Sequence, residues 1–356
     1  MAAINEYSLE QELCAQVSAL AANGGAVEIV AGGSKHFYGE TSRPELTMDV
    51  SAHSGVIDYD PAELVITLRS GCRLVDVEAL LAERGQMFAF EPPAFGEEAT
   101  IGGMVASGLT GPRRAFSGSI RDYLLGVKLI DGRGQVLQFG GRVIKNVAGF
   151  DLSRVMAGAL GTLGIILEVS LRVIPIHESE ISLAFEHARA DDHISWINQL
   201  GSQPLPISAS LWQQGKSHIR LSGSEQGLRQ AAAQLGGKAL DYDWSALKQQ
   251  QQAFFTSEEA LTRVSLPPAC ADILRDENQL IEWGGAQRWL LGEVDLTALR
   301  ERVQTEAGTV CAYRNHDAVV ARFQPLGAAM LTLQRKLKSS FDPAGVFNPG
   351  RLYAGL

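Results

Sequence analysis

The stretch VEIVAGGSKHFYG, residues 27–39, best indicates the fold of this chain. A β-branched strand leads directly into Gly32 and Gly33, which are followed by Ser34 and Lys35. Successive backbone N–H groups in such a turn can form a nest for a pyrophosphate, since two glycines bring no Cβ atoms that would block it. A tight turn without a ligand is the simpler interpretation of the pair taken alone. No GxGxxG or P-loop pattern follows, which disfavours a Rossmann or ATP site.

A second glycine-rich stretch, residues 90–130, reads FEPPAFGEEATIGGMVASGLTGPRRAFSGSIRDYLLGVKLI. Its glycines alternate with apolar residues. This pattern is more typical of an ordered, buried segment that wraps a flat ligand than of a mobile loop. Arg113 and Arg114 form a cationic pair in an otherwise acidic protein, and guanidinium groups suit carboxylate or phosphate oxygens. Solvated or salt-bridged arginines are the alternative. We therefore treat the pair as candidate catalytic residues that face substrate or cofactor.

A third stretch, residues 145–175, reads KNVAGFDLSRVMAGALGTLGIILEVSLRVIP. Glycines at 158, 161 and 164 separate a short helix expected over 147–159 from a strand expected over 164–175. The segment from Gly161 to Ile165 could present backbone N–H and C=O groups to the edge of a heterocycle.

The surrounding sequence predicts an α+β protein of two domains and a tail. Strands are expected within 27–34, 63–71 and 126–141, and a helix over 76–84 that ends at Gly85. A second α+β domain is predicted over 177–322, with helices near 223–235 and 245–253 and strands near 217–223, 262–267 and 287–293. A helix over 331–342 and a turn rich in Pro and Gly then make up a tail, 323–356, that we expect to return to the first domain, 1–176.

The composition of the chain disfavours several classes of protein. The chain has 356 residues, of which 46% are hydrophobic, and a formal net charge of -9 with no basic stripe, which opposes nucleic-acid binding. Four cysteines far apart in sequence offer no spacing typical of a zinc or iron–sulfur site, so no metal is expected. The N-terminal residues lack a secretion signal, and no apolar run reaches the roughly 20 residues of a membrane span. We expect a cytoplasmic protein that inserts no segment into a membrane and reaches its inner face only through partners.

The three glycine-rich stretches, in this order and with the closing FDPAGVFNPGR of residues 341–351, resemble the FAD-binding domain of the vanillyl-alcohol oxidase and p-cresol methylhydroxylase (PCMH) superfamily. In finer detail, the segments YDPAELVITLRSG, GSIRDYLLG, KNVAGFDLSRVMAG and EWGGAQRWL resemble the smaller FAD-binding subunit of bacterial glycolate oxidase. The resemblance implies a two-subdomain PCMH-type FAD-binding domain, a smaller α+β cap domain and a C-terminal tail that returns to the FAD domain.

The resemblance also implies which residues contact FAD. The pyrophosphate would lie on Gly32, Gly33, Ser34 and Lys35, with His36 close by. The remaining contacts would come from the second and third stretches and from the tail: Pro92, Pro93, Thr100, Gly102, Gly103, Ser107, Gly108, Gly161, Thr162, Leu163, Gly164, Ile165, Ile166, Asn348 and Arg351.

Two departures from the family pattern qualify this picture. Relatives that bond their flavin covalently place a histidine directly after the glycine pair, whereas this chain has Ser34, so non-covalent FAD is expected. Relatives that oxidise 2-hydroxy acids carry an HxGDGN-like motif in the second domain, and that motif is absent here. The histidines of this region stand singly in sequence, at His177, His187, His193, His218 and His316.

The resemblance implies an FAD-dependent oxidoreductase subunit in a complex that oxidises glycolate to glyoxylate. Electrons would pass on through a larger FAD-binding subunit and an iron–sulfur subunit. Two alternatives remain open: a non-catalytic FAD-binding scaffold that stabilises its catalytic partner, and a stand-alone flavin dehydrogenase for a 2-hydroxy acid such as D-lactate. A stand-alone flavin reductase is disfavoured because no NAD(P)H site is visible.

Overall fold

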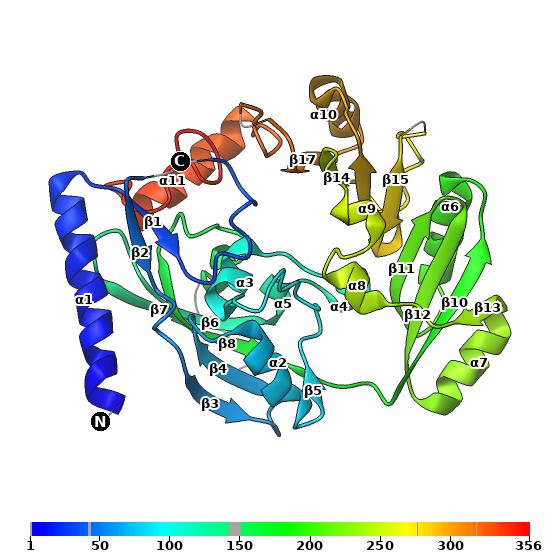
Figure 1. Cartoon of the computed structure of the whole chain (residues 1–356), viewed down its shortest axis with the longest axis horizontal. Helices are drawn as coiled ribbons and strands as arrows, with labels where there is room; N and C mark the ends of the chain where they lie inside the picture. The colour runs from blue at the N-terminus through cyan, green and yellow to red at the C-terminus, as the bar shows by residue number, and fades with distance from the viewer. Residues whose placement is uncertain (1, 42–43, 142–150, 276, 318) are drawn as a thin grey trace.

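A computed structural model describes residues 2–41, 44–141, 151–275, 277–317 and 319–356. The chain forms two lobes, with helix α1, a five-stranded sheet and helix α11 in one lobe and an eight-stranded sheet in the other (Figure 1). The N-terminal lobe contains α1 Ala2–Asn23, β1 Val27–Val30, β2 Leu46–Asp49, β3 Val56–Asp60, β4 Val65–Arg69, α2 Leu74–Ala82, β5 Gln86–Met87, α3 Ile101–Ser107, α4 Arg114–Ser117, α5 Ile120–Tyr123, β6 Leu124–Ile130, β7 Val136–Gly140, the 3-10 helix η1 Ser153–Met156, β8 Ile165–Arg172 and β9 Ile174–Pro175.

Three sheets lie among the described residues of the N-terminal lobe, one of them an antiparallel pair of β5 with β9. Strands β1 and β2 pair in parallel, and an antiparallel sheet of the described residues has the order β3-β4-β8-β6-β7. The central strands β4, β6 and β8 are runs of β-branched and leucine residues that are buried over most of their length, as strands covered on both faces require. The expected strands over 63–71, 126–141 and 164–175 and the helix over 76–84 are confirmed.

The glycine-rich residues 101–107 form the helix α3, which the sequence did not predict. Thr100 caps this helix, because its Oγ1 accepts a hydrogen bond from the N–H of Gly103 at 3.2 Å. Gly108 ends it in the left-handed region at φ +64°. The apolar residues Ile101, Met104 and Val105 lie at helical spacing and are fully buried, so packing stabilises a helix that glycine propensity disfavours.

The second lobe contains β10 Ser179–Glu186, α6 Ala190–Gly201, β11 Ile207–Gln213, β12 Lys216–Gly223, α7 Glu225–Leu235, β13 Lys238–Leu240, α8 Trp244–Lys248, α9 Ala253–Thr256, β14 Leu261–Ser265, β15 Gln279–Glu282, the 3-10 helix η2 Trp283–Gly285, β16 Gln287–Leu291, α10 Leu296–Thr305 and β17 Thr309–Arg314. Its strands among the described residues form one antiparallel sheet in the order β13-β10-β12-β11-β15-β16-β14-β17. The helix expected over 245–253 is two short helices, α8 and α9, because Gln250 between them adopts φ +53°. Of the helix expected over 147–159, residues 147–150 lie outside the described residues, and the remainder contains only η1.

The C-terminal residues return to the N-terminal lobe, as Figure 1 shows for α11 Ala328–Phe341. Phe347 pairs with Val27 beside β1, and Val346 and Phe347 pack with Leu13 and Val17 of α1. A separate cluster joins the two lobes, since Tyr38, Leu109 and Leu160 pack against side chains of the second lobe. The chain is therefore an α+β fold whose tail completes the first lobe.

Candidate functional site

A cavity of about 930 Å³ opens at the end of β1, where the sequence places the glycine pair. We call it the glycine cavity. Fourteen residues expected from the sequence line it: Gly32, Gly33, Ser34, Lys35, His36, Thr100, Gly102, Gly103, Ser107, Gly161, Gly164, Ile166, Asn348 and Arg351. Nine further residues line it that sequence reasoning missed: Glu28, Ile29, Val30, Ala31, Tyr38, Val50, Ser70, Ala106 and Leu160.

The glycine pair allows a close approach of two main-chain segments. A Cβ atom at position 32 would lie 1.5 Å from the carbonyl oxygen of Glu98, so only glycine fits there. Within the described residues, the N–H groups of Gly32, Gly33, Ser34 and Lys35 donate no hydrogen bond. Four successive N–H groups without a hydrogen-bond partner therefore line the cavity at the turn where the sequence predicts an anion nest.

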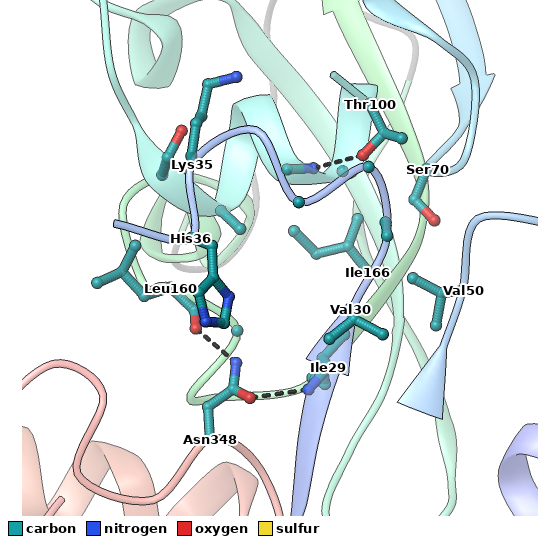
Figure 2. Close-up of a pocket in the computed structure, with 18 of the residues that line it drawn as sticks. Ile29, Val30, Lys35, His36, Val50, Ser70, Thr100, Leu160, Ile166 and Asn348 are labelled. Carbon is teal, nitrogen blue, oxygen red and sulfur yellow. Dashed lines mark hydrogen bonds between the residues drawn. The ribbon is translucent and has the colours of Figure 1, made fainter. Parts of the chain in front are cut away.

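The tail and the loop after η1 close another side of the glycine cavity. Asn348 joins them, because its Nδ2 donates to the carbonyl of Leu160 at 2.7 Å and its Oδ1 accepts from the N–H of Ile29 at 2.8 Å (Figure 2). Gly161 has φ +70°, and a Cβ atom there would lie 2.5 Å from Asn348 Nδ2. The Arg351 guanidinium donates to the carbonyls of His36 and Tyr38 and lies 3.7 Å from a carboxylate oxygen of Glu28.

A buried hydroxyl without a partner lines the same cavity. Ser70 is 1% exposed, follows β4 and uses its backbone groups to bond Leu167 and Gly102, but its Oγ has no hydrogen-bond partner among the described residues. A buried hydroxyl without a partner costs about 1–3 kcal/mol, so a ligand that bonds Ser70 in this cavity would remove a real penalty. The nest, the glycine approach and Ser70 together fit a large ligand with phosphate groups.

Six of the expected residues lie outside the glycine cavity. Leu163 and Ile165 point into the core, and Gly108 ends α3, where a Cβ atom would lie 2.9 Å from the Cα of Gly158. Thr162 is turned inward, with its Oγ1 donating to the carbonyl of Ala159. Pro92 and Pro93 are both buried, and Pro93 lines a different cavity between the lobes.

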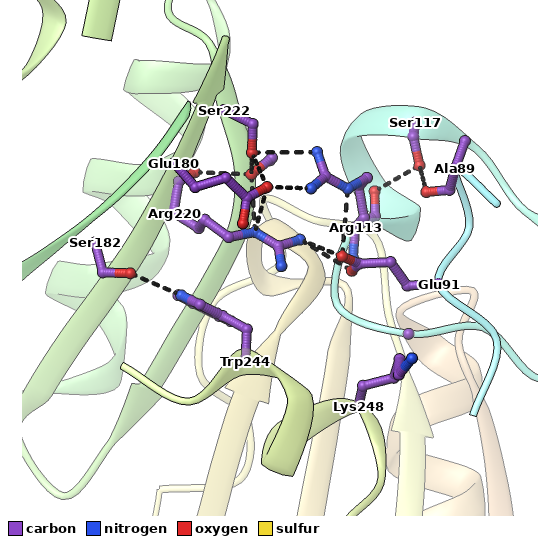
Figure 3. Close-up of polar contacts among 12 residues, drawn as sticks. Ala89, Glu91, Arg113, Ser117, Glu180, Ser182, Arg220, Ser222, Trp244 and Lys248 are labelled. Atoms are coloured by element: carbon purple, nitrogen blue, oxygen red, sulfur yellow. Dashed lines mark hydrogen bonds and ion pairs between the residues drawn. The ribbon is translucent and has the colours of Figure 1, made fainter. Parts of the chain in front are cut away.

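Neither Arg113 nor Arg114 lines the glycine cavity. Arg113 is buried in an ion cluster between the lobes, where it pairs with Glu91 at 3.4 Å and with Glu180 at 2.6 Å (Figure 3). The Arg114 guanidinium stacks on the ring of Trp283 at 4.6 Å, and burial lowers its pKa. Both cations thus belong to the contact between the two lobes.

The histidines that stand singly in sequence do not all stay apart in the fold. His187 and His193 each bond the hydroxyl of Ser217 at 2.8 Å through Nδ1. Burial lowers the pKa of His193 to about 3, so this side chain is neutral near pH 7. In the described part of the chain, no group of three or more His, Cys, Asp and Glu side chains is placed to hold a metal ion. None of the described helices is long and apolar enough to cross a membrane.

Comparison with known proteins agrees with this geometry. Residues 2–140 match the family model described as FAD binding domain. The chain is 41% identical over 354 residues to the glycolate oxidase subunit GlcE of Escherichia coli (strain K12), which covers 99% of this chain and 100% of that protein. It is 34% identical over 145 residues to a D-lactate dehydrogenase of Anaerostipes hadrus, which covers 40% of this chain and 30% of that protein.

The fold has a solved counterpart. An alkyldihydroxyacetonephosphate synthase superposes with a TM-score of 0.66 over 96% of this chain and 75% of that chain, at 14% sequence identity, which supports the fold alone. The 41% identity over the full length of both proteins shows the family as well as the fold. The chain belongs to the glycolate oxidase subunit GlcE family of FAD-dependent oxidoreductases with a PCMH-type FAD-binding fold.

Proposed function

We propose that this chain is the FAD-binding subunit of an enzyme complex that oxidises glycolate to glyoxylate, with non-covalent FAD in the glycine cavity. The observation that carries the proposal is the 41% identity with a glycolate oxidase subunit over the full length of both proteins. The D-lactate dehydrogenases match less well, at 34% identity over 40% of this chain or at 22% identity over 83% of it, which favours glycolate over D-lactate as the substrate of the complex.

Different residues of the glycine cavity would contact different parts of FAD. The free N–H groups of Gly32, Gly33, Ser34 and Lys35 would bind the pyrophosphate, and the Ser70 hydroxyl would gain a partner. Gly161, Gly164 and Ile166 would contact the adenine or ribose side, while Asn348 and Arg351 keep the tail closed over the site. Ser34 offers no imidazole for a covalent bond to the flavin ring, which is why we propose non-covalent FAD.

When bound, FAD supplies hydride acceptance and the release of electrons singly or in pairs. The chain itself binds and orients the cofactor and excludes water from its edge. We further propose that electrons leave through a larger FAD-binding subunit and an iron–sulfur subunit, and that the complex works in the cytoplasm, at the inner face of the membrane where its partners hold it.

We also propose a division of labour along the chain: residues 1–176 bind FAD, residues 177–322 form a cap and interface domain, and residues 323–356 dock on the FAD domain. The strands of the five-stranded sheet fall within the first range and those of the eight-stranded sheet within the second, which supports these boundaries.

The cofactor assignment is tested with Gly32→Ala, in which the added Cβ atom would meet the Glu98 carbonyl. We expect FAD affinity to fall at least about tenfold, which corresponds to 1.4 kcal/mol, measured by titration of the FAD-free chain. Gly201→Ala is the matched control, since a Cβ atom at position 201 meets nothing within 4 Å. A wild-type chain that retains no flavin and does not bind added FAD would refute the assignment.

The substrate is tested by anaerobic absorbance spectra of the FAD-loaded chain, alone and with its partner subunits, after addition of glycolate or D-lactate. Bleaching of the chain alone by glycolate would place substrate oxidation on this subunit. Bleaching only after the partners are added would identify the chain as an electron carrier. A flavin that stays oxidised while the assembled complex turns over glycolate would identify it as a scaffold.

A further inference from the structure

The loop of residues 91–99 in the first lobe lies against the anion nest at two places. A Cβ atom at Gly32 would lie 1.5 Å from the carbonyl oxygen of Glu98, so the loop and the nest are in direct main-chain contact. The carbonyl of Ala94 accepts a hydrogen bond from Lys35 Nζ at 3.0 Å. The position of the 91–99 loop therefore affects the shape of the glycine cavity at the nest.

A side chain of the second lobe, Gln249, bonds the middle of this loop. Residues 92–95 are Pro-Pro-Ala-Phe, so only Ala94 and Phe95 have a backbone N–H group to donate. The Oε1 of Gln249 accepts from the N–H of Ala94 at 3.0 Å and from the N–H of Phe95 at 3.1 Å. Gln249 caps the C-terminal end of α8, which lies between the two lobes (Figure 1). One amide oxygen of the second lobe thus satisfies every backbone donor of residues 92–95.

The backbone of the 91–99 loop needs such external support. Glu91 and Phe95 adopt φ +47° and +55°, in the left-handed region that residues with a Cβ atom rarely occupy. A strained backbone of this kind persists only where its surroundings hold it. The Glu91 carboxylate lies 2.8 Å from the guanidinium of Arg220 on β12. Phe95 is held by Gln249 and by an edge contact with the ring of Phe37 at 5.8 Å, so the second lobe holds both strained residues.

Ala94 connects Gln249 to the nest. Its N–H group donates to Gln249 and its carbonyl accepts from Lys35, so a shift of this one residue changes both hydrogen bonds. Lys35 also donates from Nζ to the hydroxyl of Ser34 at 3.2 Å, and the N–H groups of both residues belong to the nest. Gln249 itself does not line the glycine cavity. Its influence on a ligand there passes through the 91–99 loop.

We propose that Gln249 is a positioning residue for FAD: it holds the 91–99 loop so that Lys35 stays beside the anion nest, and it makes cofactor binding depend on the second lobe. The inference rests on the proposed function, which places FAD in the glycine cavity. It extends the cofactor site from the first lobe to a residue of the cap domain. Because coupling between two sites is reciprocal, bound FAD in turn holds the loop against Gln249.

The test is a double-mutant cycle on FAD affinity, measured by FAD titration of the full-length, FAD-free chain. Gln249→Met keeps the length of the side chain but removes the acceptor, and we expect it to weaken FAD binding at least about fivefold. Gln249→Glu retains an oxygen that accepts the same two N–H groups and should bind FAD within about twofold of wild type. In a Lys35→Met background, Gln249→Met should weaken FAD binding by less than about twofold, because its effect passes through Lys35.

Gln251→Met is the matched control, because Gln251 lies two residues further along the same run of glutamines and its side chain is exposed. This variant should bind FAD as wild type does, and circular dichroism establishes that each variant is folded.

Hydrogen exchange of the wild-type chain is a second measure that needs no variant. Bound FAD should slow exchange in the peptide that contains Ala94 and Phe95. An unchanged exchange rate, an unchanged FAD affinity in Gln249→Met, or an equal loss with and without Lys35 would overturn the inference and leave the cofactor assignment intact. A wild-type chain that binds no FAD would instead refute the proposed function, and the inference with it.

Discussion

At the scale of single residues, Lys35 shows how burial adjusts a cation beside the anion nest. Its Nζ donates to the carbonyl of Ala94 at 3.0 Å and to the hydroxyl of Ser34 at 3.2 Å, and it has no carboxylate partner among the described residues. Burial lowers the pKa of Lys35 to about 8, because the charged form loses hydration. The ammonium is therefore only partly retained at mildly alkaline pH when no anion is bound.

A bound pyrophosphate should raise the pKa of Lys35, since it favours the charged form. FAD binding then takes up a proton above pH 8, and we expect FAD affinity to fall as pH rises from about 8 toward 10. The dissociation constant measured by FAD titration across this range checks the effect. Lys35→Met should bind FAD more weakly and lose most of this slope. An equal slope in the variant would assign the pH dependence to another group.

At the scale of elements, Lys338 ties α11 to the turn that follows it. Its Nζ donates to Asp342 Oδ2 at 2.7 Å and to the carbonyls of Thr162 and Phe347 at 2.7 and 2.9 Å. The Asp342 side chain is fully buried and also accepts from the N–H groups of Val346 and Phe347. Lys338 and Asp342 together therefore hold the C-terminal tail against the loop that contains Gly161 and Thr162.

Replacing Lys338 with Met should lower the free energy of unfolding by about 3–5 kcal/mol, because a buried carboxylate loses its cation. Denaturant unfolding of the FAD-free chain measures the change. The double variant Lys338→Met, Asp342→Asn should recover part of the loss, since it also removes the uncompensated charge. Lys336→Met, at an exposed position of the same helix, should change stability by less than about 0.5 kcal/mol. Equal effects of the two single variants would contradict this account.

Most strands could be predicted from the sequence, because β-branched runs such as ELVITLRSG and GIILEVSLRVIP are bounded by glycine or proline. Helix α3 could not, since Gly102 and Gly103 conceal a helix that the Thr100 cap and buried neighbours stabilise. The break between α8 and α9 depends on one residue, Gln250, in the left-handed region, and nothing in a run of glutamines predicts it.

The candidate site was only partly predictable for a related reason. Glycine spacing indicated the turns at Gly32 and Gly161, where main chain must approach closely, but not which neighbouring side chains turn inward. Leu163 and Ile165 accordingly proved to be core residues. Ser70 was missed because a single serine after a strand has no distinctive pattern, and its unpaired hydroxyl is visible only in the fold.

At the scale of the whole molecule, a cluster of charges couples the lobes. Glu91 of the first lobe lies between two arginines, 3.4 Å from Arg113 and 2.8 Å from Arg220 of β12. Glu180 of β10 completes the cluster, at 2.6 Å from Arg113. The side chain of Glu91 is 14% exposed and that of Glu180 is 43% exposed, so water replaces the second carboxylate more readily than the first.

Glu91→Gln should therefore uncouple the lobes, because it leaves two buried guanidinium groups with a single shared carboxylate. We expect the free energy of unfolding to fall by about 3 kcal/mol, as for a broken buried pair, against about 1 kcal/mol or less for Glu180→Gln. All five tryptophans lie in the second lobe, at positions 196, 212, 244, 283 and 289, so their fluorescence follows that lobe, while circular dichroism follows the whole chain. The two thermal midpoints should coincide in wild type and separate in Glu91→Gln. Coincident midpoints in Glu91→Gln, with a stability loss no larger than in Glu180→Gln, would show that the apolar contacts around Tyr38 and Leu160 hold the lobes together without the ion cluster.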